Sequence, residues 1–381
     1  MSLPHDSVIC LTDERIEPIR SISPSKYLFA RRCPLSYILT KTKVWQFSPD
    51  NAAAIVGTAI HELIRWSGKS ATSEVTHEQA AAKFDDLIAQ AESKLSTHPL
   101  NRRLIKLSES DPRFPEKRHA AIKSAVRGVK SPRPTSGNIA GGITKYMFEE
   151  GFSSNDKLIY GEVDKIVYGP RGFVIYDKKS CHVIDEEGYV KGEYRLQLLL
   201  YAGIVYEDIG VMADRLVLVD INDREVEVPF HPDEALEELA VAARWLVSLN
   251  EKIVQAGSVL KLLHLAKPSP DACRYCPSRP ICASYWKART AMTGEWPVDV
   301  EYEVESTIAL GNNGKLIMAK PQGSGKSLKV APEFVSYQPG VQNLIPGQKI
   351  RLINGRAQGR QHSLTKRSVV YVIGDGLWGQ P

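Results

Sequence analysis

Hydrophobic residues recur at helical spacing in the first third of the chain. Between Ile55 and Trp66 the apolar side chains lie three and four residues apart, and the same spacing returns between Glu78 and Leu95. This period places apolar residues on one face of a helix, so both segments are predicted to be amphipathic helices. Proline residues at 111–115 and 131–136 bound a further segment, which is predicted to be a basic helix between two loops.

The pattern changes to strand-like runs from Lys157 onwards. Two such runs, Lys157–Tyr168 and Gly172–Tyr176, are joined by Gly169-Pro170-Arg171, which is typical of a hairpin turn. The order of the elements that follow predicts a mixed α/β core. These elements are a Leu-rich helix, a second hairpin and a long amphipathic helix, expected over Tyr194–Tyr206, Asp214–Phe230 and Pro232–Ala256.

The chain after Trp296 has short strand-like runs separated by glycine turns and no convincing helical pattern. This predicts a separate small β-barrel of the OB type, which either binds single-stranded nucleic acid or only stabilises the chain. Tyr337 and Tyr371 are candidates for stacking on bases, with a place in the barrel core as the alternative. The segment Gly323–Ser327 resembles a phosphate-binding loop, but the first glycine of such a loop falls on Lys320, so a β-turn is expected.

The expected domain organisation has three parts. A tail occupies residues 1–20, a main domain spans residues 21–290 with a basic helical insertion at about 100–135, and the barrel spans residues 296–381.

Composition excludes several classes of protein. The 381 residues are 43% hydrophobic and 24% charged, which is typical of a folded globular chain and not of a disordered or fibrous one. The chain has no stretch of roughly 18 uninterrupted apolar residues, so no membrane span is expected. The first twenty residues mix acids, bases and proline and do not resemble a secretory signal, which predicts a cytoplasmic protein.

Basic residues are concentrated in two regions. The formal net charge is only +5, but residues 101–135 hold ten basic residues against three acidic ones. Residues 306–381 hold ten basic residues against two acidic ones. Two regions of one sign indicate a polyanionic partner such as nucleic acid, and the alternative is an ordinary solvated surface.

Two carboxylates and a lysine end neighbouring predicted strands. Asp164 ends the segment Gly161–Asp164, and Asp177-Lys178-Lys179 ends the next strand after a tight turn, so two adjacent strands are expected to bring these groups together. Strand alternation places Asp177 and Lys179 on one face and turns Lys178 away, although its carbonyl could still bind a metal. Mg²⁺ binds hard oxygen ligands, and a nearby lysine stabilises negative charge on a phosphate. This pattern favours metal-assisted hydrolysis.

Four motifs in this order resemble the PD-(D/E)XK nuclease superfamily, specifically its RecB-like exonucleases and the CRISPR-associated iron-sulfur exonucleases. They are the helical G-x-x-x-H at Gly57–His61, the G-x-x-D at Gly161–Asp164, the D-x-K at Asp177–Lys179 and the Q-x-x-x-Y at Gln197–Tyr201.

The resemblance implies a role for each matching residue. His61, Asp164, Asp177 and the Lys178 carbonyl would bind Mg²⁺ or Mn²⁺, and Lys179 would position the attacking water and stabilise the transition state. Gln197 and Tyr201, four residues apart on one helix face, would orient Lys179 or the substrate strand. Glu149 and Glu150 precede the metal strand, as acids often do in this family, and their role stays open.

Three of the six cysteines are clustered as Cys273-x2-Cys276-x5-Cys282, a spacing that holds a metal or cluster. A zinc ribbon would need a second nearby C-x2-C pair, whereas a [4Fe-4S] cluster can take its fourth thiolate from far along the chain. The resemblance implies that Cys33 is this fourth ligand. The cluster would then be a structural staple that closes a loop of about 240 residues. Cys10 and Cys181 are expected to be free thiols.

The function expected from these features is that of a metal-dependent DNA exonuclease acting on single-stranded ends, in DNA repair and recombination or phage defence. Two alternatives stay open. The chain could be a non-catalytic module that binds DNA ends, or an adaptor in a larger complex with a helicase or CRISPR-type partner. The full set of His61, Asp164, Asp177 and Lys179 favours the enzyme.

Overall fold

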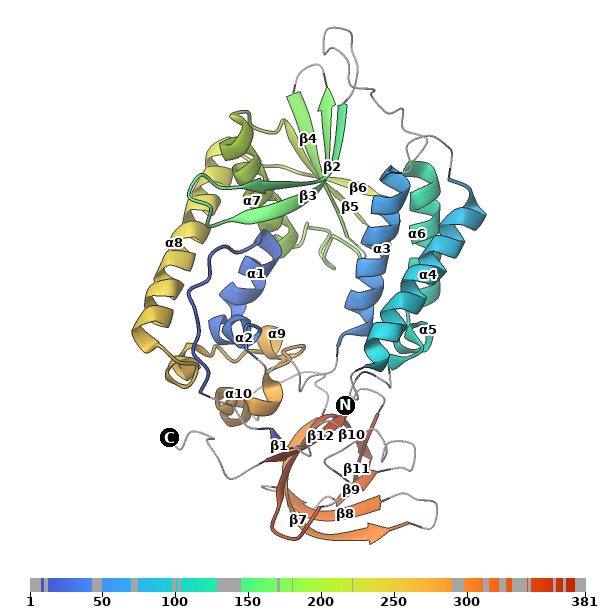
Figure 1. Ribbon diagram of the computed structural model, residues 1–381, viewed down its shortest axis with the longest axis vertical. Coiled ribbons are helices and arrows are strands. Elements are labelled where there is room, and N and C mark those ends of the chain that lie inside the picture. Colours follow the sequence, from blue (N-terminus) through green and yellow to red (C-terminus); the bar gives the residue numbers. More distant parts are fainter. Residues whose placement is uncertain are drawn as a thin grey trace.

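The computed structural model consists of a five-stranded sheet with flanking helices, a bundle of helices and a curled C-terminal sheet (Figure 1). Cys10, Tyr337, residues 131–136 and residues 323–326 lie outside the residues that the structure describes. Among the helices of the described residues, none is long and apolar enough to cross a membrane. The described residues are 8–9, 13–42, 50–69, 75–97, 101, 104–128, 145–169, 172–179, 181–220, 222–289, 298–310, 315–321, 327–330, 341, 344–358, 361–365 and 368–373.

The central sheet has the strand order β2-β3-β4-β5-β6. Neighbouring strands are antiparallel except for β4 and β5, which are parallel, so the chain must cross over between them. Helix α7 (Gly192–Ile209) provides this crossover, and the predicted mixed α/β core is confirmed. The strands are β2 (Lys145–Ser153), β3 (Tyr160–Gly169), β4 (Gly172–Lys178), β5 (Arg215–Val219) and β6 (Glu225–Val228).

Helix α7 is buried between the sheet and helix α8 (Pro232–Ala256). Its residues from Gln197 to Val205 are all buried, which explains why its sequence is apolar on every side. A Cβ atom at Gly203 would lie 3.0 Å from the backbone oxygen of Ala235 in α8, so glycine permits this close approach. Pro232 at the first helical position starts α8, and Gly257 in the left-handed region ends it.

The apolar core of the central sheet also includes residues that come before and after its strands in the chain. Ile16 and Ile19 are buried in it, and Asn250 of α8 makes two hydrogen bonds to the backbone of Ile19, at 2.8 Å and 2.9 Å. Part of the segment that the sequence assigns to a tail is therefore held against α8 at Ile19. The same core includes α1 (Pro24–Arg32), α2 (Pro34–Leu39), the 3-10 helices Leu260–Leu265 and Arg279–Ile281, α9 (Pro270–Cys273) and α10 (Ala283–Ala288).

Helices α3 to α6 form a bundle with its own apolar core, which we call the helical arm. Phe84, Leu63 and Ile122 are buried in this core, which shares no residue with the core of the central sheet. Figure 1 shows the arm on the opposite side of the molecule from α8. The predicted helices of the first third are thus confirmed. Their bounds are α3 (Ala52–Lys69), α4 (His77–Ser96), α5 (Leu107–Ser110) and α6 (Phe114–Gly128).

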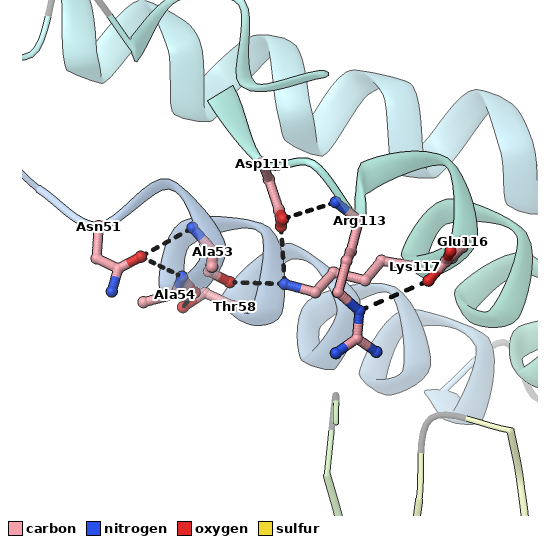
Figure 2. A network of polar contacts seen from close by, with 8 residues as sticks. All are labelled: Asn51, Ala53, Ala54, Thr58, Asp111, Arg113, Glu116 and Lys117. Carbon is pink, nitrogen blue, oxygen red and sulfur yellow. Dashed lines mark hydrogen bonds and ion pairs between the residues drawn. The ribbon is translucent and has the colours of Figure 1, made fainter. Parts of the chain in front are cut away.

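The buried Lys117 of α6 forms an ion pair with Asp111 and also contacts the start of α3 (Figure 2). Lys117 Nζ lies 2.7 Å from Asp111 Oδ2, with both side chains buried, and also donates to the Ala53 carbonyl at 3.5 Å. Asn51 Oδ1 accepts from the backbone N–H of Ala53 and so caps α3. These contacts fix the first turn of α3 against α6.

Several basic residues of the arm have carboxylate partners within the arm itself. Arg118 makes a two-pronged pair with Asp85, at 2.9 Å and 2.7 Å. Further pairs are Lys117–Asp111, Arg113–Glu116 and Lys106–Glu109. These pairs neutralise part of the basic surface that the sequence predicted for a polyanionic partner.

The C-terminal sheet is curled and mostly antiparallel. Its strands β7, β8, β9, β11 and β10 pair in a ring, because β10 pairs with β7 as well as with β11. Strand β12 pairs with β10, and β1, from the expected N-terminal tail, pairs with β12. The strands are β1 (Val8–Ile9), β7 (Val298–Ala309), β8 (Lys315–Pro321), β9 (Ser327–Val330), β10 (Lys349–Gln358), β11 (Gln361–Ser363) and β12 (Val369–Ile373).

Tyr371, a candidate for stacking on bases, is a core residue. Its side chain is 4% exposed and belongs to the apolar core that also contains the central sheet. A buried ring cannot offer its face to a base, so the stacking prediction is wrong for Tyr371 and its alternative is confirmed.

Candidate active site

The polar residues of the predicted site gather where β3 and β4 separate. The pairing of the two strands runs from Gly169 and Gly172 to Lys165 and Tyr176, and Asp164 is the next residue of β3. The Lys178 backbone N–H donates to Asp164 Oδ2 at 2.7 Å, so this carboxylate spans the gap that opens between the strands. On its other side β4 stays paired with β5, because Lys179 N–H donates to the Val219 carbonyl at 2.8 Å.

Asp177 and Lys179 face helix α7, where Gln197 and Tyr201 are one turn apart. Lys179 Nζ lies 2.6 Å from Asp177 Oδ2 and donates to Gln197 Oε1 at 2.8 Å. The Gln197 amide in turn donates to Asp177 Oδ1 at 3.4 Å and to the Tyr201 hydroxyl at 3.2 Å. The structure thus brings together Asp164, Asp177, Lys179, Gln197 and Tyr201, as the sequence predicted.

Burial controls the electrostatics of this group. Asp177 is only 2% exposed, and burial raises the pKa of its carboxyl from 3.8 to about 6. The Lys179 ammonium and His61 act against this rise in pKa, whereas the neighbouring Asp164 adds to it. Burial also raises the pKa of Tyr201, so its phenol stays protonated.

His61 reaches the same place from the helical arm. It lies on α3, is half-buried and lines a small cavity with Lys178 and Lys179 at the end of β4 and with Lys117 of α6. Its charge is felt at Asp177. The structure therefore places the predicted histidine at the end of β4 with Lys178 and Lys179, near enough to act on Asp177, although it comes from a different apolar core.

The chemistry of these residues fits a magnesium or manganese ion. Two carboxylates converge, and Asp177 Oδ2 is a buried carboxylate oxygen that lies 2.6 Å from the Lys179 ammonium. Such an oxygen is suited to a hard cation. In the described part of the chain, no group of three or more His, Cys, Asp or Glu side chains is already arranged as a complete metal site.

Lys178 and Glu150 point elsewhere. The Lys178 ammonium lies 2.8 Å from Asp223 Oδ1 in the β5–β6 turn and also donates to Ser124 Oγ of α6. Its side chain thus turns away from Asp177, as strand alternation predicted. Glu150 is exposed on β2 and pairs in register with Val163, and the side chain of Glu149 lies outside the described residues.

Sequence reasoning missed Tyr194, which is the third member of the α7 face. The Lys179 ammonium lies 5.1 Å from the centre of its ring, and its hydroxyl contacts Cys181 Sγ at 3.0 Å. Burial raises the pKa of the Tyr194 phenol as well. Tyr194, Gln197 and Tyr201 follow one another at intervals of three and four, so the helical period was a signal that could have found it.

A family model for the PD-(D/E)XK nuclease superfamily matches residues 21–283, which is more than half of the chain. The chain belongs to this superfamily. Its members are generally metal-dependent nucleases, and the match supports DNA as the substrate and Mg²⁺ or Mn²⁺ as the metal. A search of curated proteins gives no match.

The matched region of this PD-(D/E)XK protein also includes the predicted cluster cysteines. Cys33, Cys273, Cys276 and Cys282 all line one cavity, although Cys33 is far from the others in sequence. Ser36 Oγ lies 3.1 Å from Cys276 Sγ, and the backbone N–H groups of Lys267 and Tyr285 donate to Cys33 Sγ and Cys282 Sγ, both at 3.4 Å. None of the described cysteines forms a disulfide.

The surroundings of Cys273, Cys276 and Cys282 disfavour the ionised form of their thiols. Burial is the main cause that raises the pKa of Cys273 and Cys276, and it raises the pKa of Cys282 to about 12. Of the four cysteines at this cavity, Cys33 and Cys273 are buried and Cys276 and Cys282 are half-buried, and within the described residues they are not gathered into a metal-holding group.

Proposed function

We propose that this chain is a Mg²⁺- or Mn²⁺-dependent exonuclease that hydrolyses phosphodiester bonds at single-stranded DNA ends. The observation that carries the proposal is the half-buried Lys179 ammonium, which is held between Asp177 and Gln197, one residue after the Lys178 N–H that donates to Asp164. Two carboxylates and a positioned ammonium at one end of a sheet are suited to attack on a phosphate.

Asp164, Asp177, the Lys178 carbonyl and His61 would hold the metal, which supplies positive charge for the phosphate and for the attacking water. Lys179 then has two roles. Its ammonium orients the water and stabilises the negative charge that develops on the phosphate oxygens. Gln197 fixes the Lys179 ammonium, and the Tyr201 hydroxyl fixes the Gln197 amide, so the lysine does not have to reorganise during the reaction.

The preference for single strands rests on the C-terminal sheet. The ring β7-β8-β9-β11-β10 supports a five-stranded OB-like barrel, a fold that often binds single strands. We place the activity in DNA repair and recombination or in phage defence. The partner that we propose is a helicase or a CRISPR-type complex. A non-catalytic module that binds DNA ends is the alternative.

The cysteine cavity is proposed to hold a [4Fe-4S] cluster with a structural role. The cavity joins α2 to the segment that carries Cys273, Cys276 and Cys282, so a cluster would fasten the two ends of the matched region together. Backbone N–H groups that donate to sulfur are a usual feature around such clusters.

The nuclease activity is tested with end-labelled single-stranded and double-stranded DNA, Mn²⁺ and anaerobically purified protein. Lys179→Ala and Asp177→Ala should each lower cleavage by at least about 10²-fold, because they remove charge stabilisation in the transition state. DNA affinity should stay within a few-fold of the wild type, and the exposed Lys252→Ala serves as a matched lysine control. Normal turnover by Lys179→Ala would reject the nuclease mechanism. A wild-type protein that binds DNA without cleaving it would favour the end-binding alternative.

The cluster is tested by metal analysis and absorption spectroscopy of the same anaerobic protein. The wild type should be brown and contain iron, and Cys276→Ser should lose both iron and thermal stability. Cys181→Ser, at a thiol outside the cavity, should retain both. Stoichiometric zinc without iron would contradict the cluster.

A further inference from the structure

The proposed metal site is assembled from two separately packed parts of the chain. Asp164, Asp177 and Lys179 belong to strands whose apolar residues join the central core, whereas His61 lies on α3 of the helical arm. The two apolar cores share no residue. The position of His61 relative to the carboxylates therefore depends on how the arm is held against the end of the sheet.

Lys178 makes a direct contact across this boundary. Its ammonium donates to Ser124 Oγ of α6 in the arm and forms an ion pair with Asp223 Oδ1 at 2.8 Å in the β5–β6 turn. The side chains of Lys178 and Asp223 are only 20% and 21% exposed. A second polar contact joins Arg65 of α3 to Glu162 of β3, but its atoms are 3.8 Å apart and both side chains are largely exposed.

The turn that presents Asp223 is itself well fixed. Asp220 is buried, and its Oδ1 accepts from the backbone N–H groups of Asn222 and Arg224 at 2.8 Å and 3.0 Å. Asp223 has a φ of 60°, so its backbone lies in the left-handed region that tight turns use. Lys178 is thus held by a rigid acceptor on the sheet side and reaches the arm with its remaining donors.

We propose that the Lys178 side chain is a positioning residue that fastens the helical arm to the catalytic end of the sheet and so sets His61 relative to Asp164 and Asp177. The inference rests on the proposed function and assigns a role to the middle residue of the Asp177–Lys179 motif. A direct phosphate contact is the competing role for a lysine here. The Asp223 partner disfavours that role because it already neutralises the ammonium.

Hydrogen exchange tests the fastening directly, without metal or DNA. Lys178→Met keeps the backbone carbonyl and the aliphatic chain but removes the ammonium, and Ser124→Ala removes the acceptor on the arm. Both variants should speed exchange in α3 and α6, because weaker docking favours local opening. Lys83→Met is the matched control, since Lys83 lies on α4 and pairs with Asp86 of the same helix. Unchanged exchange in both test variants would overturn the proposal.

Mn²⁺ binding to the free protein, measured by calorimetry, tests the consequence for the site. Lys178→Met should weaken Mn²⁺ binding by about 10-fold or more, as loss of an outer-shell partner commonly does. Lys178→Arg should restore much of the affinity. The double variant with His61→Ala should bind no more weakly than the worse single variant, because both changes remove the same ligand. Additive losses would overturn the proposal, as would a flatter salt dependence of DNA binding with unchanged Mn²⁺ affinity.

Two wild-type results separate this inference from the proposed function. A wild-type chain that neither binds Mn²⁺ nor cleaves DNA overturns both. A wild-type chain that does both, beside a Lys178→Met variant with unchanged Mn²⁺ affinity, overturns the inference alone.

Discussion

Asp177 lies among groups whose effects on its charge oppose one another. It is buried, which favours the neutral acid, and Asp164 acts in the same direction, whereas Lys179 and His61 favour the carboxylate. The pKa near 6 shows that burial outweighs the two basic neighbours. In the metal-free protein this residue is therefore a source of instability at neutral pH, which a bound cation would relieve.

This balance predicts how stability depends on pH in EDTA. The folded-state pKa of Asp177 is raised from 3.8 to about 6, so the folded state binds more protons between these values and becomes more stable as the pH falls through 6. Asp177→Asn cannot gain this proton. The melting temperature of Asp177→Asn minus that of the wild type should therefore be higher at pH 7.5 than at pH 5, by roughly 2 °C for an effect of about 1 kcal/mol.

Differential scanning calorimetry at the two pH values checks this prediction. Lys252→Ala is the control, because its melting temperature minus that of the wild type should be the same at both pH values. The comparison between pH values cancels the constant effect of the Asn side chain on Lys179. A difference that is constant or reversed in sign would show that Asp177 does not titrate as its burial implies.

At the scale of elements, helix α7 covers one side of the site and supplies polar side chains to it. Three of its side chains, Tyr194, Gln197 and Tyr201, face the end of β4, and the middle of the helix, from Gln197 to Val205, is buried. The same burial explains why the helix looks uniformly apolar in sequence.

The ring of Tyr194 should contribute to catalysis through the Lys179 ammonium. Tyr194→Leu removes the ring face and should lower kcat by about 10-fold, within the range of 0.5–2 kcal/mol given for cation–π contacts. Tyr194→Phe keeps the ring and loses only the hydroxyl contact with Cys181, so its kcat should stay within about two-fold. Single-turnover cleavage at saturating DNA measures both, and equal losses in the two variants would assign the effect to the hydroxyl.

The sequence predicted the elements with a clear period and missed those without one. The helices over Ile55–Trp66 and Pro232–Ala256 and both hairpins of the central sheet are present. Strand β2 was not predicted, because Lys145–Ser153 mixes glutamates and glycine with apolar residues and lacks alternation. Asp164, Asp177, Lys179, Gln197 and Tyr201 could be predicted because their motifs are local. The separate core of the arm and the partners of Lys178 depend on contacts between distant segments.

At the scale of the whole molecule, the C-terminal sheet is joined to the cysteine segment by buried polar contacts. Arg279, which lines the cysteine cavity, lies 3.1 Å from Asp299 Oδ2 of β7, with side chains 5% and 2% exposed. Arg351 of β10 donates to the Pro280 carbonyl at 2.7 Å and lies 4.5 Å from the centre of the Trp286 ring. Breaking one partner of a buried ion pair costs about 3–5 kcal/mol, so removal of the whole sheet would destabilise the cysteine segment.

Binding of single strands by the C-terminal sheet is therefore tested in the full chain with point variants. Lys349 and Arg356 are exposed on β10, whereas Arg351 on the same strand is buried by its pair with Glu301. If Lys349 and Arg356 contact phosphates, each change to alanine should reduce the slope of log K against log salt by about 0.7. Cleavage at saturating DNA should be unchanged, because neither residue lies at the site.

The measurement is fluorescence anisotropy with a labelled single strand over a series of salt concentrations. Arg15→Ala is the matched control, since Arg15 is an exposed arginine outside the C-terminal sheet and pairs with Glu17. A double variant of Lys349 and Arg356 with the wild-type affinity and salt slope would contradict the prediction. The sheet would then serve to stabilise the cysteine segment through Arg279 and Arg351, which is the alternative that its buried contacts already support.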